Sequence, residues 1–240
     1  MTNKLFLQEP YTREAEAQVI ARTPEGGVVL DSTIFYPTGG GQPGDSGTLN
    51  WGSGSTLDIA TTIKGEGNQI VLLPAAPAAL PTVGSVIRQQ LNWERRHRHM
   101  RIHTALHILS VVIPLPVTGG SIGTDKGRLD FDMPEPLENR EELEEGINAL
   151  IDRDLPIGET WITDAELDAN PGLVKTLRVQ PPRGSGKVRL IAIGEGREMI
   201  DLQPCGGTHV ARTGEIGRIH FGKVEKKGAT NRRVNIVLDV

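Results

Sequence analysis

Cysteine, aromatic residues and long hydrophobic runs are scarce in this 240-residue chain. The single cysteine, Cys205, excludes an internal disulfide and is typical of a protein from a reducing compartment. Aromatic residues make up only 4% of the sequence, so we expect a core of Leu, Ile, Val and Ala. There is no run of about 18 apolar residues, and the first residues contain no apolar stretch of signal-peptide length. We therefore expect a cytoplasmic protein without a membrane-spanning segment.

Neither sign of charge dominates, because 26 basic residues face 30 acidic ones and the formal net charge is −4. This balance argues against a general nucleic-acid binder. The charges are nevertheless segregated: residues 135–169 are strongly acidic, whereas residues 181–240 carry an excess of Lys and Arg. A third cluster, residues 93–101, places four arginines around one glutamate. Local basic patches suit a polyanion site, and solvated helix and strand faces are the alternative explanation.

Glycine is abundant, with 29 residues, and together with 16 prolines it indicates many turns and short strands. Residues 1–92 combine β-forming runs with Gly/Pro/Asn clusters, which predicts a small β-barrel or sandwich. Two later segments, 93–113 and 137–153, show the apolar spacing of helices. Strand-like runs between and after them predict an α+β fold with two main helices packed on an antiparallel or mixed sheet. The predicted domains are residues 1–90, a β-barrel with a glycine-rich loop, and residues 91–240.

Two histidines, His103 and His107, lie one turn apart on one face of the first predicted helix. Such a pair can chelate a metal ion, and His99 with His103 has the same spacing. Cys205 precedes His209 by four residues, and the two glycines between them favour a tight turn around a metal. The four side chains form an N3S donor set that suits zinc. The alternatives are a buried thiol with solvent-facing histidines, or a Cys205 nucleophile with a histidine base.

The glycine-rich loop contains Gly39, Gly41 and Gly44 in the spacing Gly-x-Gly-x-x-Gly, which also occurs in dinucleotide-binding loops. Pro43 interrupts the loop and no helix start follows it, so the context does not match such a site. Consecutive glycines expose backbone N–H groups and let a ligand approach closely. The loop is therefore a candidate binding element, with a simple barrel hairpin as the alternative.

Several segments together resemble one known family. His103-Thr-Ala-Leu-His107 and Cys205-Gly-Gly-Thr-His209 are similar to the split zinc motif of alanyl-tRNA synthetase editing domains and of the freestanding AlaX editing proteins. Threonyl-tRNA synthetases share a related domain. Further stretches that agree with the family are residues 33–47, 127–132, 213–217 and 226–239. Because residues precede position 90 and no extension follows position 240, the medium form of AlaX resembles the chain best.

The resemblance implies a trans-editing hydrolase that deacylates mischarged tRNA(Ala), with serine or glycine as the wrong amino acid, and spares Ala-tRNA(Ala). The implied fold is an N-terminal β-barrel followed by a zinc-containing α+β editing domain. The implied cofactor is one Zn²⁺ per chain. The implied partner is the acceptor end of tRNA(Ala), with no membrane and no obligate protein partner. The alternative functions are deacylation of another aminoacyl-tRNA or ester, and non-catalytic tRNA binding with a structural zinc.

Residue roles follow from the same resemblance and from the needs of ester hydrolysis. The implied metal ligands are His103, His107, Cys205 and His209. Thr104 and Thr208 flank them and are the catalytic candidates that could orient a water. The candidates for substrate binding are Gly39, Gly40, Gly41, Gln42 and Asp130. The candidates for tRNA binding are Arg95, Arg96, Arg98, Arg101, Lys226, Lys227, Arg232 and Arg233. Three protein ligands would leave zinc an open position and lower the pKa of a water to about 7, whereas four would close a tetrahedral site.

Overall fold

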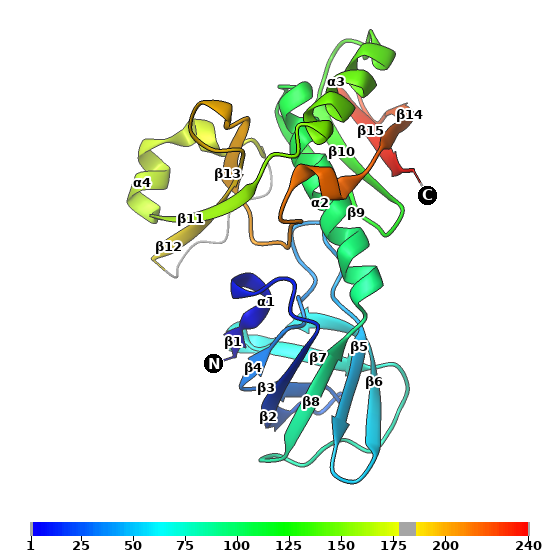
Figure 1. Cartoon of the computed structure of the whole chain (residues 1–240), viewed down its shortest axis with the longest axis vertical. Coiled ribbons are helices and arrows are strands. Elements are labelled where there is room, and N and C mark those ends of the chain that lie inside the picture. The colour runs from blue at the N-terminus through cyan, green and yellow to red at the C-terminus, as the bar shows by residue number, and fades with distance from the viewer. Residues whose placement is uncertain (1, 178–185, 240) are drawn as a thin grey trace. The chain divides into compact units, whose positions relative to one another are not determined.

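The computed structural model describes residues 2–177 and 186–239 and divides into two compact units, Met1–His97 and Arg98–Val240. Each unit contains its own sheets (Figure 1). The fold is α+β and includes a closed antiparallel barrel, which confirms the predicted fold class. The functional separation of residues 1–90 from residues 91–240 stays a prediction. Within the described ranges, no helix combines the length and apolarity needed to cross a membrane.

The first unit is built around a six-stranded barrel in the order β2-β3-β7-β6-β5-β8. The strands are β2 (Glu14–Arg22), β3 (Val28–Leu30), β5 (Gly47–Trp51), β6 (Ser55–Lys64), β7 (Ile70–Pro74) and β8 (Val86–Leu91). Burial alternates along β2 and β8 because successive strand residues point to opposite faces. The inward-facing side chains, among them Val19, Leu49 and Ile87, fill the barrel. The shorter elements are β1 (Asn3–Lys4), α1 (Leu5–Gln8), β4 (Ser32–Thr33) and η1 (Glu66–Asn68).

An ion pair lies buried inside the first unit. The side chains of Arg96 and Asp45 are 0% and 1% exposed, and Arg96 Nε donates to Asp45 Oδ2 at 2.8 Å. Arg96 also donates to the carbonyl oxygens of Ile34 and Pro10, and Asp45 Oδ2 accepts a hydrogen bond from the Tyr36 amide. Buried charges are stable only when they are paired and hydrogen-bonded. The pair therefore fixes the backbone on both sides of the glycine-rich loop.

The second unit contains two antiparallel sheets within its described residues. The larger sheet has the order β14-β15-β10-β9. Its strands are β9 (Val117–Ile122), β10 (Lys126–Asp132), β14 (Ile219–Lys226) and β15 (Asn231–Leu238). The smaller sheet has the order β11-β12-β13 and is formed by β11 (Ile157–Thr163), β12 (Lys187–Ile193) and β13 (Asp201–Pro204). The apolar cluster of Leu167, Val188 and Leu190 packs against this smaller sheet.

Helices α2 (Trp93–Val112) and α3 (Arg140–Asp152) confirm the two predicted helices, with ends shifted by at most three residues. Helix α2 lies directly on β10, because a Cβ at Gly127 would come within 2.4 Å of Ile102 Cγ2 and 3.2 Å of Leu106 Cδ1. Helix α3 is joined to β14 through Asn148, whose amide exchanges two hydrogen bonds with the backbone of Ile219. These contacts place the larger sheet against both helices.

Helix α4 (Asp164–Ala169) was not predicted from the sequence. A capping box starts it, because the Glu166 amide donates to Thr163 Oγ1 at 3.1 Å and the Thr163 amide donates to Glu166 Oε2 at 2.7 Å. The remaining short helices are η2 (Pro171–Leu173), η3 (Gly196–Glu198) and η4 (Thr213–Ile216). Helix α4 has only six residues, which is too short for a helical pattern of apolar residues to be recognised in the sequence.

Substitution Arg96→Ala would leave Asp45 as an unpaired buried carboxylate. We expect the free energy of unfolding to fall by about 3–5 kcal/mol. Arg88→Ala is the matched control, because Arg88 pairs with Glu14 but its side chain is 63% exposed, and here we expect a loss of no more than about 1 kcal/mol. Urea unfolding followed by tryptophan fluorescence measures both. Equal losses in the two variants would contradict a structural role for the buried pair.

Candidate metal centre

The four predicted metal ligands meet in the second unit. The nitrogen and sulfur atoms of His103, His107, Cys205 and His209 all lie within 4.8 Å of one another. Cys205 Sγ is 3.4 Å from His103 Nε2 and 3.2 Å from His209 Nε2. The three rings are buried, with exposed fractions of 4% to 7%. This arrangement rules out solvent-facing histidines, and it brings together His103 with His107 and not with His99.

The periodicity of α2 and the turn after β13 explain this convergence. His103 and His107 occupy successive turns of α2, so both rings point to the same side of the helix. Cys205 follows directly on β13, and the next residues form an irregular turn whose Gly207 amide donates to Cys205 Sγ at 3.4 Å. The turn brings His209 back beside the sulfur. Two segments about a hundred residues apart thereby supply two ligands each.

Arg189 on β12 is hydrogen-bonded to the backbone of this turn. This contact was not predicted from the sequence. The Arg189 guanidinium Nη1 donates to the carbonyl oxygens of Cys205, at 3.2 Å, and Gly207, at 2.9 Å. Its Nε pairs with Glu159 on β11 at 2.5 Å. Backbone carbonyls in an irregular turn need donors when they are buried. Arg189 therefore satisfies the turn and fixes the position of the cysteine.

Thr104 fixes the orientation of His209. The Thr104 hydroxyl donates to the Met100 carbonyl at 2.9 Å, so its single proton is already used. It must therefore accept at its 3.1 Å contact with His209 Nδ1, as it does from the Val210 amide at 3.3 Å. A proton on Nδ1 leaves the lone pair on Nε2, which is the atom that faces Cys205. The tautomer needed for metal binding is set in this way.

The charges within the metal-free cluster favour a thiolate. Burial by itself raises the pKa of the Cys205 thiol, but the adjacent His103 and His209 outweigh it and hold that pKa well below its usual range. Burial lowers the pKa of His107, yet hydrogen bonds to Asp201 and Cys205 dominate and raise it to about 9. Burial, reinforced by His103, lowers the pKa of His209 to about 3. These shifts favour the deprotonated forms of Cys205 and His209 and retention of a proton on His107.

Comparisons with known proteins agree with these features. The family described as "Threonyl and Alanyl tRNA synthetase second additional domain" matches residues 188–235, and the family described as "tRNA synthetases class II (A)" matches residues 5–95. The alanyl-tRNA editing protein AlaX-M of Methanosarcina acetivorans is 34% identical over 99% of both chains. This chain belongs to the AlaX-M family. The AlaX-M of Saccharolobus solfataricus is 33% identical over 98% of both chains.

Two longer proteins contain a segment that is similar to this chain. The alanyl-tRNA editing protein AlaX-L of Pyrococcus horikoshii is 34% identical over 98% of this chain, which covers 57% of that protein. The alanine–tRNA ligase of Caldivirga maquilingensis is 35% identical over 94% of this chain, which covers 25% of the ligase. The resemblance inferred from the sequence motifs is thus confirmed. The alignment with AlaX-M covers nearly the whole length of this chain.

The glycine-rich loop of this AlaX-M family member is a tight hairpin in the first unit. Gly39 and Gln42 exchange two backbone hydrogen bonds, and Gly40 and Gly41 have positive φ angles of 57° and 81°. Tyr36 donates its hydroxyl proton to the Gly39 carbonyl at 2.8 Å. The Gln42 side chain is fully buried. The loop is therefore a hairpin. Its role in substrate binding stays a prediction.

Asp130, predicted to contact substrate, lies on β10 between two arginines. Its carboxylate accepts hydrogen bonds from Arg233 Nε and Nη2 at 2.8 and 3.0 Å and from Arg128 Nη1 at 2.7 Å. Burial raises the pKa of Asp130, but the two arginines outweigh it and the pKa is lowered. A substrate amino group would have to compete with these two cations. A direct contact with substrate stays a prediction.

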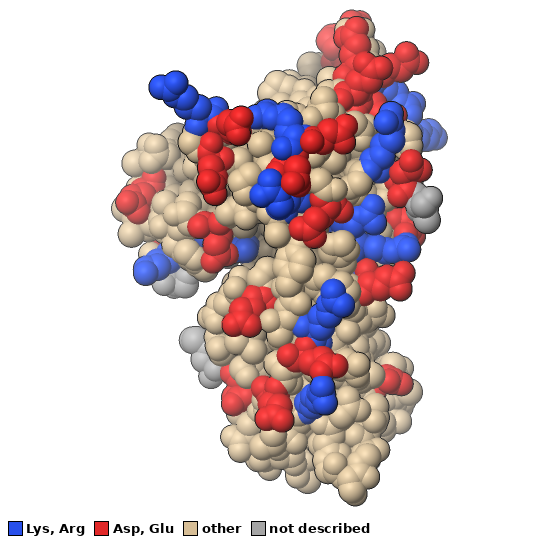
Figure 2. All heavy atoms as spheres, in the orientation of Figure 1, with Lys and Arg blue, Asp and Glu red and all other residues tan. Residues whose placement is uncertain are grey.

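Several predicted tRNA-binding residues are already engaged within the protein. Arg96 is fully buried against Asp45, which keeps its guanidinium out of reach of a phosphate and counts against its predicted role. Arg232 donates to the carbonyl oxygens of Pro134 and Glu135, and Lys227 pairs with Glu225. On the face shown in Figure 2, Lys and Arg side chains alternate with Asp and Glu. Sequence charge alone thus overstates the basic surface.

The other predicted tRNA-binding residues are at least partly exposed to solvent. Arg95 donates to the Gly44 carbonyl at 2.8 Å, Arg98 pairs with Asp125 at 2.5 Å, and Arg101 donates to the Ile216 carbonyl at 2.8 Å. All three arginines are partly exposed, so they keep N–H groups that a phosphate could reach. Lys226 at the end of β14 is exposed.

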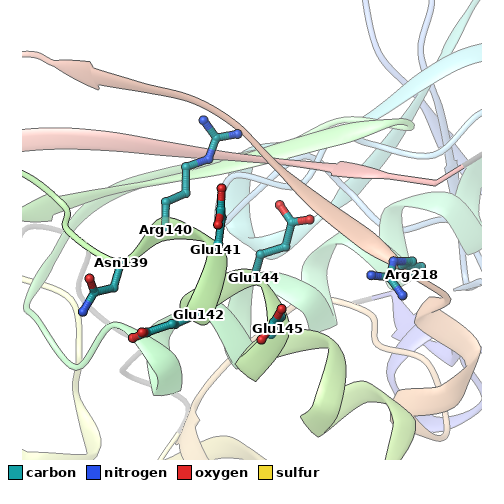
Figure 3. Close-up of a pocket in the computed structure, with 7 residues that line it drawn as sticks. All are labelled: Asn139, Arg140, Glu141, Glu142, Glu144, Glu145 and Arg218. Carbon is teal, nitrogen blue, oxygen red and sulfur yellow. The ribbon is translucent and has the colours of Figure 1, made fainter.

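A cavity of about 580 Å³ lies at the start of α3 in the second unit (Figure 3). It is lined by Asn139, Arg140, Glu141, Glu142, Glu144, Glu145 and Arg218. The Glu144 carboxylate accepts a hydrogen bond from the Phe221 amide at 2.7 Å and faces His220 Nδ1 at 2.9 Å. Acidic side chains in the first turn of a helix are favoured by the helix dipole. The helix dipole therefore accounts for Glu141 and Glu142, and we assign no substrate to this cavity.

Zinc binding to the cluster should release the proton of His107, because metal ligands bind in deprotonated form. The pKa of His107 is raised to about 9, so the zinc affinity should fall as the pH falls below that value. The lowered pKa values of Cys205 and His209 favour the deprotonated forms of these two ligands. Calorimetry at several pH values, in two buffers of different ionisation enthalpy, measures the affinity and the proton release. An affinity independent of pH would contradict this assignment of the His107 proton.

Proposed function

We propose that the protein hydrolyses, in trans, the ester bond of mischarged tRNA(Ala), chiefly Ser-tRNA(Ala), with Gly-tRNA(Ala) as a second substrate. Ala-tRNA(Ala) is spared. The observation that carries the proposal is the convergence of His103, His107, Cys205 and His209, from two distant segments, on one buried cluster. The names of the relatives, which are alanyl-tRNA editing proteins, supply the substrate class.

Zinc is the ion that this donor set fits. A tetrahedral zinc with its usual bonds to nitrogen and sulfur separates a sulfur from a nitrogen ligand by ~3.5 Å. The sulfur-to-nitrogen distances of 3.4 and 3.2 Å to His103 and His209 are close to this value. When bound with an open coordination position, the ion would act as a Lewis acid toward the ester carbonyl. A Cys205 nucleophile explains the site less well, since it needs one histidine base and three imidazoles surround this sulfur.

The side chains beside the ligands have separate tasks in this proposal. Thr104 acts through His209, because its hydroxyl already serves Met100, His209 and Val210. Thr208 is the remaining candidate for orienting the attacking water. It is buried and immediately precedes His209 in the chain. Ester hydrolysis needs this orientation more than it needs a strong nucleophile, because an aminoacyl ester is already reactive.

Selectivity requires a group that recognises the serine hydroxyl. Serine exceeds alanine by this one hydroxyl, and a site that hydrogen-bonds it rejects alanine because buried polar groups would be left unpaired. The candidates are Gln42, the backbone N–H groups of Gly39–Gly41, and Asp130. Gln42 is the first of these to test, since its amide can both donate to and accept from a hydroxyl.

The acceptor stem is held through its phosphates. We assign this role to Arg95, Arg98, Arg101 and Lys226, with Lys227, Arg232 and Arg233 as supporting residues. Arg96 is left out because it is fully buried. Basic side chains that release counterions from phosphates give a binding constant that depends on salt.

The decisive experiment compares hydrolysis of Ser-tRNA(Ala) and Ala-tRNA(Ala) by the zinc-loaded protein. We expect rapid loss of serine with alanine retained, and a loss of at least about 100-fold in the double variant His103→Ala/Cys205→Ala, because Lewis-acid stabilisation is worth several kcal/mol. His220→Ala is the matched control, a histidine outside the cluster, and should keep full activity. In the same assay, Gln42→Ala should reduce the serine-to-alanine ratio.

The outcomes of that experiment separate the alternatives. Turnover of another aminoacyl ester, with Ser-tRNA(Ala) untouched, would move the activity to a different substrate. Binding of tRNA without any turnover, in protein that is folded and zinc-loaded, would identify a binding module with a structural metal. An unchanged serine-to-alanine ratio in Gln42→Ala would exclude Gln42 as the discriminating group.

Affinity for tRNA(Ala) should fall with salt, with a slope of about −0.7 to −0.9 in log K against log salt for each contacted phosphate. Single substitutions of Arg98 or Lys226 by Ala should each reduce the slope by about one contact. Arg22→Ala is the control, since Arg22 is exposed on β2 but lies outside the proposed set. Filter binding between about 50 and 200 mM salt measures the slope. A flat dependence would remove these residues from the binding surface.

A further inference from the structure

A buried carboxylate contacts the Nδ1 edge of His107. Asp201 Oδ2 is 3.0 Å from His107 Nδ1, and the Asp201 side chain is 0% exposed. His107 also supplies one of the four ligand atoms that lie within 4.8 Å of one another in the cluster. The imidazole therefore belongs both to the metal cluster and to a contact with a buried carboxylate.

The charge of Asp201 is balanced by a lysine from another part of the unit. Lys175 Nζ lies 2.5 Å from Asp201 Oδ1 and 3.4 Å from Ser110 Oγ on α2. The lysine side chain is 26% exposed, whereas the carboxylate that it reaches is fully enclosed. A buried carboxylate is costly unless it is paired and hydrogen-bonded, and here each oxygen has a partner. Lys175 thus allows a full negative charge to be kept next to His107.

Gln203 completes the arrangement. Its Nε2 donates to Asp201 Oδ2 at 2.7 Å and lies 3.0 Å from His107 Nδ1. An amide N–H and a ring N–H cannot bond to each other, so the short Gln203–His107 distance reflects their shared acceptor, Asp201 Oδ2. The carboxylate oxygen thereby takes two protons from two directions. Rotation of the Asp201 side chain would break both hydrogen bonds.

The strand β13 explains why these groups meet. Asp201 and Gln203 are two residues apart on this strand, so both point to the same face. Cys205 follows directly after the strand. One short segment therefore supplies a metal ligand and the groups that hold a second ligand from α2.

We infer that Asp201, supported by Lys175 and Gln203, is a positioning residue that fixes the tautomer and ring orientation of His107 for metal binding. With the Nδ1 proton directed to Asp201, the lone pair of Nε2 is available to the ion. The inference rests on the proposed metal site. It goes beyond that proposal because it concerns residues that touch neither the ion nor the substrate. Removal of such a partner weakens metal binding by about 10- to 100-fold.

The test measures zinc affinity by competition with a chromogenic chelator, for the full chain and for Asp201→Ala, Asp201→Asn and Lys175→Met. We expect the dissociation constant to rise by about 10- to 100-fold in Asp201→Ala. Asp201→Asn keeps an acceptor oxygen for the Nδ1 proton, so it should recover part of the loss. Lys175→Met should have an intermediate effect, because it removes the balancing charge and leaves the hydrogen bond to His107.

Asp45→Ala is the matched control, since Asp45 is also a buried carboxylate paired with a cation but belongs to the barrel unit. It should lower the unfolding temperature of the metal-free protein without changing zinc affinity. The visible spectrum of the Co²⁺-substituted protein is a second readout, because it reports ligand geometry and a merely structural role would not move it. We expect a shifted spectrum in Asp201→Ala and an unchanged one in Asp45→Ala.

The outcomes are distinguishable from failure of the proposed function. Zinc affinity and Co²⁺ spectrum of Asp201→Ala indistinguishable from those of the unmodified chain would overturn the inference, as would an equal loss of affinity in Asp45→Ala. Absence of zinc binding by the unmodified chain would overturn the inference together with the metal site. Absence of deacylation, with the affinity differences intact, would overturn only the editing activity.

Discussion

The candidate metal cluster contains three buried imidazoles and one cysteine sulfur, and it depends on which nitrogen of each ring carries the proton. A histidine binds a metal through a nitrogen that carries no proton, so the opposite nitrogen must hold the proton and donate it elsewhere. In this protein the Thr104 hydroxyl oxygen accepts a hydrogen bond from His209 Nδ1, and the Asp201 carboxylate accepts one from His107 Nδ1. The position of α2, the exit of β13 and the turn that Arg189 holds all serve this requirement. The cluster is therefore the product of several long-range contacts and not of its motif alone.

The local part of this design could be predicted from the sequence. Helical spacing places His103 and His107 on one face, and the glycines after Cys205 indicate a turn that returns His209 to the sulfur. The partners behind the ligands could not be predicted in the same way, because Asp201 lies 94 residues from His107 in the chain. One signal was available: the spacing of Asp201 and Gln203 predicts a common face once β13 is known to be a strand that ends just before Cys205. That strand has only four residues and was not predicted separately.

Charge is the property that sequence reasoning interpreted least well. Four arginines in residues 93–101 have the same formal charge, yet Arg96 turns into the barrel unit and pairs with Asp45, while Arg95 and Arg98 remain partly exposed. Burial depends on which side of a helix meets the neighbouring strands, and composition contains no such information. The basic run on β15 is also partly neutralised within the protein. Arg233 faces Asp130 directly across the β10–β15 ladder, so two residues distant in sequence neutralise each other.

The absence of a side chain at Gly127 has a consequence for the geometry of the metal ligands. Ile102 and Leu106, which would collide with a Cβ at this position, are the residues immediately before His103 and His107 in α2. Helix α2 can approach β10 this closely because Gly127 has a hydrogen atom where other residues have a Cβ. A methyl group there would push outward the same two helical turns that present the imidazoles, while β13 and its cysteine belong to a different sheet and would not follow. The reach of the two histidines toward the sulfur therefore depends on how closely the adjacent face of α2 packs on β10.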